Sequence, residues 1–233
     1  MPEWAFDQAS TKQRLRDFFS RNRADVAAFG STVNQTFEAF VFASVIEWYR
    51  SRGWTVQIVN PIDQITKKTR FRLKFSTRGR PDNYSYAVAH KRRKAVQIRH
   101  QLRVATNSHR RNKRFYANVC LDVAVIRACD LSGYKTFFAV PNRSLITFGE
   151  AKHMSAFAEL IAGFLGLVHE LQPKRLQKLP SRPRPGRHLA PFLFVSGLLL
   201  RTAQGIEYTI KRRGFDVDIY SSTNQLSSAF AKK

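Results

Sequence analysis

The chain has 233 residues, of which 43% are hydrophobic, so it can bury a substantial core and is not intrinsically disordered. Its 40 Lys and Arg residues against 16 Asp and Glu give a formal net charge of +24, which points to a polyanionic partner, with nucleic acid as the leading candidate. No stretch approaches the roughly 20 apolar residues that span a bilayer, and the N-terminal residues hold no apolar secretory segment. We therefore expect a cytoplasmic protein that does not bind membranes.

Residues 1–30 contain a polar helical stretch with few core-facing positions, which predicts an N-terminal helical arm. The next helix has the clearest boundaries, because Thr32 can cap it, Gln35 follows as in a capping box, and Gly53 ends it. Apolar residues cover most of its faces, which predicts a largely enclosed helix. Residues 55–60 then alternate between polar and apolar positions, as a strand does.

From Lys67 to Phe115 the composition changes sharply, to 17 Lys and Arg against one acid, Asp82. We interpret residues 61–115 as a basic β-rich insertion whose strands have one core face and one cationic face. The clearest alternation sets Val96, Ile98, Leu102 and Val104 against Gln97, Arg99, Gln101 and Arg103. The residues expected to contact nucleic acid are Arg70, Arg72, Lys74, Arg78, Arg80, Lys91, Arg92, Arg93, Arg110, Arg111, Lys113 and Arg114.

Alternatives remain for parts of this basic segment. The run at residues 91–94 also fits a solvated hairpin turn, and residues 109–114 also fit a mobile basic loop. Tyr84 and Tyr86 can stack on unpaired bases, although cross-strand packing is the more common use of such a pair.

Two later strands carry charged residues in apolar surroundings. Asp122 lies inside VCLDVAVI, a run typical of a strand buried on both faces, where an unpaired carboxylate is costly. Glu150 and Lys152 lie two residues apart in ITFGEAKHM and therefore project from the same face of a strand. The pattern D-x27-E-x-K can place two metal-binding carboxylates and an ammonium at one site, a combination suited to phosphodiester cleavage.

The C-terminal third alternates helices and strands. Its apolar spacing and turn signals predict, in order, a helix from residue 155 to 171, a basic proline-rich connector over 173–188, a strand over 190–196, a helix over 200–214, a strand over 215–222 and a flexible tail over 221–233.

This order of elements, with Phe37-Glu38, Asp122 and Glu150-Ala151-Lys152, resembles the PD-(D/E)XK nuclease superfamily. The resemblance covers roughly residues 31 to 220, and Leu121 stands where the family motif has proline. It implies an α/β protein with the restriction-endonuclease-like fold, in which helices flank a mixed central sheet.

The resemblance also implies roles for individual residues. Asp122 and Glu150 would bind Mg²⁺ or Mn²⁺ with the Ala151 carbonyl, while Lys152 would orient or help deprotonate the attacking water. Glu38 would be the auxiliary glutamate of the first helix. We prefer it to Glu47, which lies nine residues further on and faces the opposite side of the helix.

These expectations describe a magnesium-dependent endonuclease with DNA favoured over RNA as substrate, acting as a homodimer or within a larger complex. One alternative is a nucleic-acid-binding protein that keeps the fold without catalysis. Another is an antiphage or toxic effector nuclease, a defence protein activated by a partner. At the residue level, Glu150 and Lys152 also fit a simple ion pair at a strand end.

Overall fold

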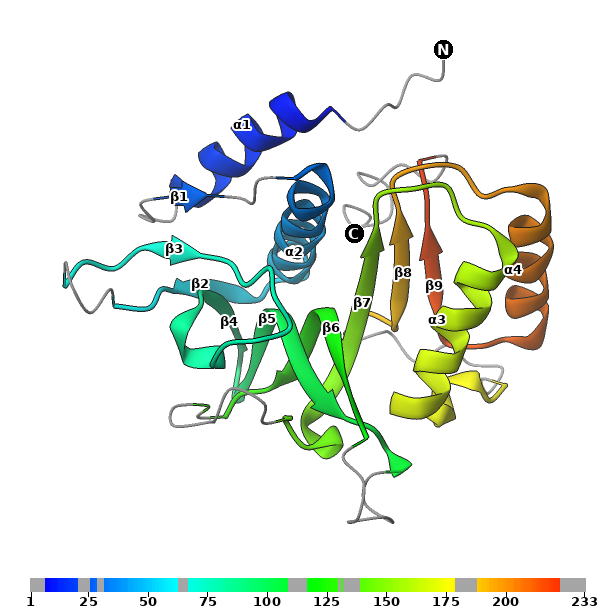
Figure 1. The fold of residues 1–233 in the computed structure, drawn as a ribbon. Coiled ribbons are helices and arrows are strands. Elements are labelled where there is room, and N and C mark those ends of the chain that lie inside the picture. Colours follow the sequence, from blue (N-terminus) through cyan, green and yellow to red (C-terminus); the bar gives the residue numbers. More distant parts are fainter. Residues whose placement is uncertain are drawn as a thin grey trace.

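The chain has an α/β fold in which helices flank a mixed sheet of seven strands (Figure 1). The structure is a computed structural model that describes residues 7–20, 26–28, 32–62, 67–108, 117–129, 131, 139–178 and 188–222. Parts of the predicted N-terminal arm, basic loop, connector and tail therefore lie outside the described residues. Within the described ranges, no helix is long and apolar enough to cross a membrane.

The strands of the main sheet are ordered β2-β4-β5-β6-β7-β8-β9. Neighbours from β2 to β7 are antiparallel, whereas β7, β8 and β9 are parallel. The parallel strands are joined through α3 (Ala158–Leu171) and α4 (Arg201–Arg213), as parallel connections require. The strands are β2 (Thr55–Val59), β4 (Tyr86–Lys91), β5 (Lys94–Ala105), β6 (Asn118–Arg127), β7 (Leu145–Lys152), β8 (Phe192–Val195) and β9 (Asp218–Tyr220).

Two hydrophobic clusters form the core, one on each face of the sheet. The first joins the sheet to α1 (Gln8–Ser20) and α2 (Val33–Ser51), and the second joins it to α3 and α4. Figure 1 shows the two pairs of helices on opposite sides of the sheet. The remaining elements are the short strands β1 (Val26–Ala28) and β3 (Phe71–Arg72), which pair with each other, and the 3₁₀ turns η1 (Pro81–Asn83), η3 (Asn142–Ser144) and η4 (Pro173–Leu176).

The predicted boundaries of α2 are confirmed. The Thr32 hydroxyl accepts a hydrogen bond of 3.2 Å from the Gln35 backbone N–H, and Gly53 follows the helix with a φ of +73°. Eleven of the 19 residues are buried, so the helix is enclosed as its composition indicated. This enclosure fixes α2 against the sheet, and with it the position of Glu38.

The N-terminal helix is more than an arm. Leu15 and Phe19 of α1 are buried in the first core cluster, and the ring of Phe19 stacks on that of Phe71 with 3.9 Å between centroids. Helix α1 therefore contributes to the core beside α2.

The interpretation of residues 61–115 as an insertion needs correction. The segment supplies β4 and β5, which lie between β2 and β6 inside the main sheet. It is thus integral to the sheet, because β2 reaches the rest of the sheet only through it.

The expected division of β5 into one core face and one cationic face is also wrong. Val96 and Ile98 pack in the first core cluster, whereas Leu102 and Val104 pack in the second, on the opposite side of the sheet. Arg99, expected on the cationic face, is only 5% exposed. The alternation fails for two reasons. The strand is covered on both faces, and the alternation of its side chains between the two faces is interrupted at Gln101, as described below.

Gly149 allows a close approach between β7 and β8. A Cβ atom at this position would lie 2.1 Å from Cζ of the buried Phe192 ring. We predict that Gly149→Ala lowers the free energy of unfolding by about 1–3 kcal/mol, because an enclosed ring must shift. Gly163→Ala in α3 is the matched control, since nothing lies within 4 Å of an added Cβ there. Chemical denaturation that finds equal stabilities for the two variants would contradict this packing.

Candidate active site

The candidate site lies where β6 and β7 separate. Their regular pairing ends at Val123 opposite Gly149, whereas β7 continues along β8 as far as Lys152. Beyond that pair, Oδ2 of Asp122 accepts a hydrogen bond of 2.9 Å from the backbone N–H of Ala151. The Asp122 carboxylate thus accepts a hydrogen bond from a buried backbone N–H that is not paired with a carbonyl of β6.

The ammonium of Lys152 joins the two acidic residues of the D-x27-E-x-K pattern. Its Nζ lies 2.9 Å from Oδ2 of Asp122 and 2.9 Å from Oε2 of Glu150. Asp122 is only 6% exposed, so this cation supplies the compensating charge that a buried carboxylate needs. The structure therefore brings Asp122, Glu150, Ala151 and Lys152 together.

A glutamine that the sequence did not single out links these residues to the helix α2. Nε2 of Gln101 donates hydrogen bonds of 2.8 Å to Oδ1 of Asp122 and 3.0 Å to Oε2 of Glu38. Its Oε1 accepts a hydrogen bond of 3.3 Å from the Cys120 thiol. We call Glu38, Gln101, Asp122, Glu150 and Lys152 the carboxylate–lysine cluster.

Gln101 reaches the cluster through an unusual backbone conformation. Its φ is +51°, in the left-handed region that non-glycine residues rarely adopt, although it lies inside β5. The regular register of β5 and β6 skips this residue, which lies level with Asp122. As a result, the consecutive side chains of His100 and Gln101 both approach Glu38, whereas in a regular strand they would point to opposite faces.

Glu38 lies on α2 between the side chains of Gln101 and His100. Nε2 of His100 lies 3.3 Å from Oε2 of Glu38, while Nδ1 of His100 lies 2.5 Å from the Lys74 carbonyl oxygen. Because a carbonyl only accepts, Nδ1 carries a proton, and Nε2 carries one only in the charged imidazolium. Glu47, the alternative considered from sequence, is instead 54% exposed and pairs with Arg50.

Burial sets the proton affinities of the cluster. Burial, together with the charge of Asp122, raises the pKa of Glu150 to about 7. Burial alone would lower the pKa of Lys152, but Glu150 and Asp122 raise it above its ordinary value. At neutral pH the lysine is therefore charged, while the glutamic acid is close to its titration midpoint.

Two nitrogen groups keep the carboxylates apart. The Gln101 amide lies between Glu38 and Asp122, and the Lys152 ammonium lies between Asp122 and Glu150. Within the described ranges, no three His, Cys, Asp or Glu side chains are grouped so as to hold a metal ion. The donor chemistry nevertheless suits a hard cation, since the cluster holds three carboxylates and Oε1 of Glu150 is buried without a hydrogen-bond partner among the described residues.

The residues expected to contact nucleic acid divide into three groups. Those exposed to solvent are Arg70, Arg72, Arg78, Arg80, Lys91, Arg92 and Arg93. Lys74 is only 4% exposed, so its prediction as a surface contact is wrong; β3 ends at Arg72, and the expected alternation does not extend to it. Those that lie outside the described residues are Arg110, Arg111, Lys113 and Arg114.

Some of the exposed cations have a local structural explanation. Arg80 pairs with Asp82 at 2.6 Å. Arg92 and Arg93 form the turn between β4 and β5, since Lys91 is paired with Lys94. The hairpin that the sequence offered as an alternative for this basic run is therefore present.

Comparisons of the chain with protein-family models, curated proteins and solved structures gave no match. Function is therefore inferred from the geometry and chemistry of the carboxylate–lysine cluster.

The raised pKa of Glu150 predicts a pH-dependent stability. Between its ordinary value of 4.5 and about 7, the folded protein holds a proton that the unfolded chain has released. This group's stabilisation is therefore complete below the lower value and is lost as the pH rises to the upper one. Glu150→Gln cannot titrate, so it should gain on the order of 1–3 kcal/mol relative to the native protein between about pH 5 and pH 8.

Denaturation curves across this pH range measure the difference in unfolding free energy. Glu47→Gln, which removes an exposed carboxylate from α2, is the control for the change in net charge. A Glu150→Gln difference that stays constant from about pH 5 to pH 8 would show that the carboxyl is not destabilised by burial.

Proposed function

We propose that this chain is a metal-dependent nuclease with a restriction-endonuclease-like fold, which hydrolyses phosphodiester bonds and has DNA as its first candidate substrate. The observation that carries the proposal is the convergence of Asp122, Glu150 and Lys152 at the point where β6 and β7 separate. Two acids and an ammonium on adjacent strands suit a divalent cation and a phosphate better than they suit a stability role, because buried charges are costly to keep.

The order of elements supports the same proposal. Helix α2 is followed by the antiparallel neighbours β5, β6 and β7, then by α3 and by β8, which is parallel to β7. The order along the chain of helix, acidic strand, Glu-x-Lys strand, helix and strand is the one that the resemblance to the nuclease superfamily led us to expect, whereas the resemblance left the pairing of the strands open.

The residues that would hold Mg²⁺ or Mn²⁺ are Asp122 and Glu150, with the Ala151 carbonyl and with Glu38 as the auxiliary carboxylate. When bound, such an ion polarises the phosphate and lowers the pKa of a coordinated water. Oε1 of Glu150 is the oxygen best placed for this role, because it is buried and has no partner among the described residues.

The protein's own groups supply the rest of the chemistry. The charges of Glu150 and Asp122 raise the pKa of Lys152, so the charged ammonium can donate hydrogen bonds to a phosphoryl oxygen or to the attacking water. In the structure, Asp122 and Glu150 hold this ammonium through two contacts of 2.9 Å, from which a bound cation would displace it. Gln101 positions Glu38 and Asp122 relative to each other.

Exposed cations support nucleic acid as the substrate. Arg70, Arg72 and Arg78 are exposed on and beside β3, near the start of β4, and Arg92 and Arg93 are exposed at the β4–β5 turn at its other end. With a net charge of +24, these side chains favour binding to a polyanion through counterion release.

A second candidate function is nucleic-acid binding without catalysis. Each carboxylate of the cluster already has a partner, since Lys152 bridges Asp122 and Glu150, and Gln101 bridges Asp122 and Glu38. Apart from Oε1 of Glu150, this network is satisfied without an ion, and it could serve only to hold α2 against the sheet. The same network fits a nuclease that stays inactive until a partner rearranges it.

Substitution of Asp122 distinguishes these functions. We predict that Asp122→Asn lowers Mg²⁺-dependent cleavage by about 10²–10⁴-fold, because it removes a charge that binds the cation and orients Lys152. Nucleic-acid binding, which depends on exposed cations, should change less than about twofold and keep its salt dependence. Plasmid and RNA incubated with Mg²⁺ or with EDTA report cleavage and substrate, and fluorescence anisotropy reports binding.

The matched control is Glu47→Gln, which neutralises an exposed acid on the far side of α2 and should cleave as the native protein does. Cleavage by Asp122→Asn at the native rate would rule out the assigned site. Absence of any Mg²⁺-dependent cleavage by the native protein, with binding intact, would favour the non-catalytic function.

A further inference from the structure

Arg99 is a buried cation without a directly paired carboxylate among the described residues. It is 5% exposed, and no carboxylate oxygen of the described residues lies within 4.0 Å of its guanidinium. Its Nε donates to Oε1 of Gln97 at 2.8 Å, and one terminal nitrogen donates to the Pro81 carbonyl at 3.1 Å. Burial lowers the pKa of Arg99 to about 10, and Asp82, the acid that partly offsets this effect, is itself paired with Arg80.

A buried guanidinium in this state is incompletely compensated, so a bound anion would stabilise it. Arg99 also has unused donors, because a guanidinium carries five N–H groups and its hydrogen bonds to Gln97, Pro81 and the Tyr86 side chain use three.

Arg99 lines a pocket of about 370 Å³, within the range of sites that hold small molecules, and Asp82, which pairs with Arg80, lines it too. Two tyrosine rings share the lining, and the guanidinium carbon of Arg99 lies 3.7 Å from the centroid of the Tyr86 ring. The lining also includes Asn60, whose Oδ1 accepts a hydrogen bond from the Ser85 hydroxyl. The Asn60 amide N–H groups have no partner among the described residues and remain available to a ligand.

These groups match the parts of a nucleotide. Tyrosine rings pack against any base, an amide can bond to the edge of a base, and a guanidinium binds a phosphate. An apolar ligand would leave Arg99 without an anion, and inorganic phosphate would leave most of the pocket unfilled.

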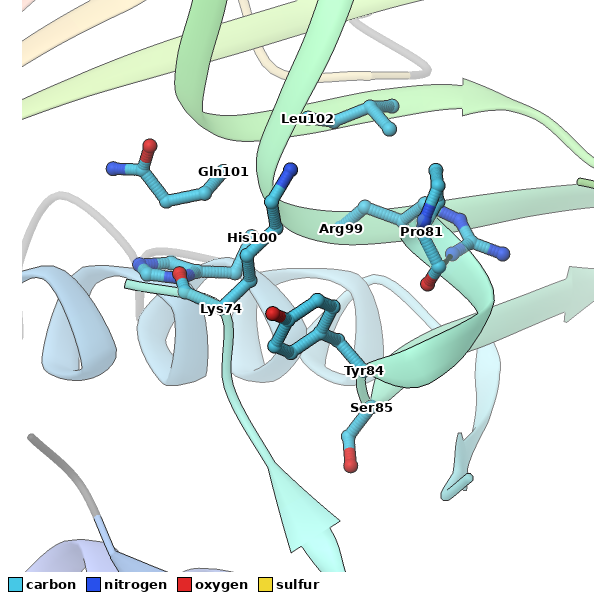
Figure 2. Close-up of a pocket in the computed structure, with 8 residues that line it drawn as sticks. All are labelled: Lys74, Pro81, Tyr84, Ser85, Arg99, His100, Gln101 and Leu102. Atoms are coloured by element: carbon cyan, nitrogen blue, oxygen red, sulfur yellow. Dashed lines mark hydrogen bonds between the residues drawn. The ribbon is translucent and has the colours of Figure 1, made fainter. Parts of the chain in front are cut away.

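The pocket and the carboxylate–lysine cluster lie on opposite sides of the strand β5. A smaller cavity, shown in Figure 2, is lined by Tyr84 and Arg99, which also line the pocket, and by Gln101, which belongs to the cluster. Figure 2 shows Arg99 and Gln101 leaving β5 in opposite directions. Their Cα atoms are about 7 Å apart, because they lie two residues apart along one strand. Their side chains belong to two different sites.

We propose that the pocket binds one unpaired nucleotide of a nucleic-acid strand, with the base against Tyr84 and Tyr86 and the phosphate on Arg99. This inference rests on the proposed function for the nature of the substrate, and it deepens that function by assigning a preference for single-stranded or locally unpaired regions. A base inside a duplex is stacked and paired on both sides, so it cannot enter such a pocket without leaving the helix.

Binding measurements in EDTA test this site without any contribution from cleavage. The probes are a labelled single-stranded oligonucleotide, the same sequence as a duplex, and an unlabelled mononucleotide as competitor. Tyr84→Leu removes an aromatic wall and Arg99→Met removes the anion-binding charge. Each should weaken single-strand binding by about tenfold while changing duplex binding by less than about twofold.

Arg143→Met is the matched control, because it removes the same charge from an exposed residue of the turn η3 that has no part in the proposed binding residues. It should weaken single-strand and duplex binding equally and by less than about twofold. Thermal unfolding identifies any variant that fails to fold; if Arg99→Met does so, Tyr84→Leu carries the test, since it leaves the buried guanidinium in place.

Equal losses for single strand and duplex, or no loss in Tyr84→Leu, would overturn the proposal. A second outcome would also overturn the proposal. If the native protein binds the mononucleotide more tightly than the two variants do, but binds single strand and duplex equally, the ligand is a free nucleotide. The pocket proposal and the nuclease assignment can fail separately. If the binding measurements overturn the pocket but Asp122→Asn still loses cleavage, only the pocket proposal fails.

Discussion

The candidate site depends on how one buried carboxylate is compensated. Asp122 accepts hydrogen bonds from the Ala151 backbone, from the Lys152 ammonium and from the Gln101 amide, each at 2.8 or 2.9 Å. Removal of any one donor would leave a buried charge with fewer partners, which is more costly than losing an exposed contact. These three donors come from β7 and β5, the two neighbours of β6, so the charge of Asp122 also fixes the strands on either side of it.

The backbone at Gln101 is the second constraint. A left-handed conformation inside a strand is unfavourable for a residue with a side chain, and it persists only where the surrounding structure holds it. Here it turns the Gln101 amide toward Asp122 and Glu38 and leaves Arg99 directed toward the pocket on the other side. The positive φ at Gln101 thus allows β5 to contribute side chains to two sites, which gives a physical reason for this strained residue.

Much of the architecture could be predicted from the sequence, and the reasons are local. The helix α2 has a cap at Thr32 and a glycine after its end, and α4 ends at Gly214 with a φ of +65°. The strands around Asp122 and Glu150 are apolar runs with few alternatives. Spacing of two residues within a strand places Glu150 and Lys152 on one side, so this part of the site follows from strand geometry alone.

Other features have no local signal. Gln101 is neither glycine nor asparagine, the residues that usually mark a left-handed position, and strand alternation assigns it to the face of Arg99. The burial of Lys74 and Arg99 depends on segments that close over them, and charge patterning treats both as surface residues. Tertiary packing therefore decides which cations of the basic segment are exposed, and composition does not.

The central claim is that the carboxylate–lysine cluster binds a divalent cation. The most direct measurement is a crystal structure with Mn²⁺, in which anomalous scattering locates the ion independently of activity. The account predicts an anomalous peak about 2.0–2.2 Å from an oxygen of both Asp122 and Glu150, with Lys152 displaced from its bridging position. Crystals at saturating Mn²⁺ without such a peak, and with Lys152 still bridging the two carboxylates, would contradict it.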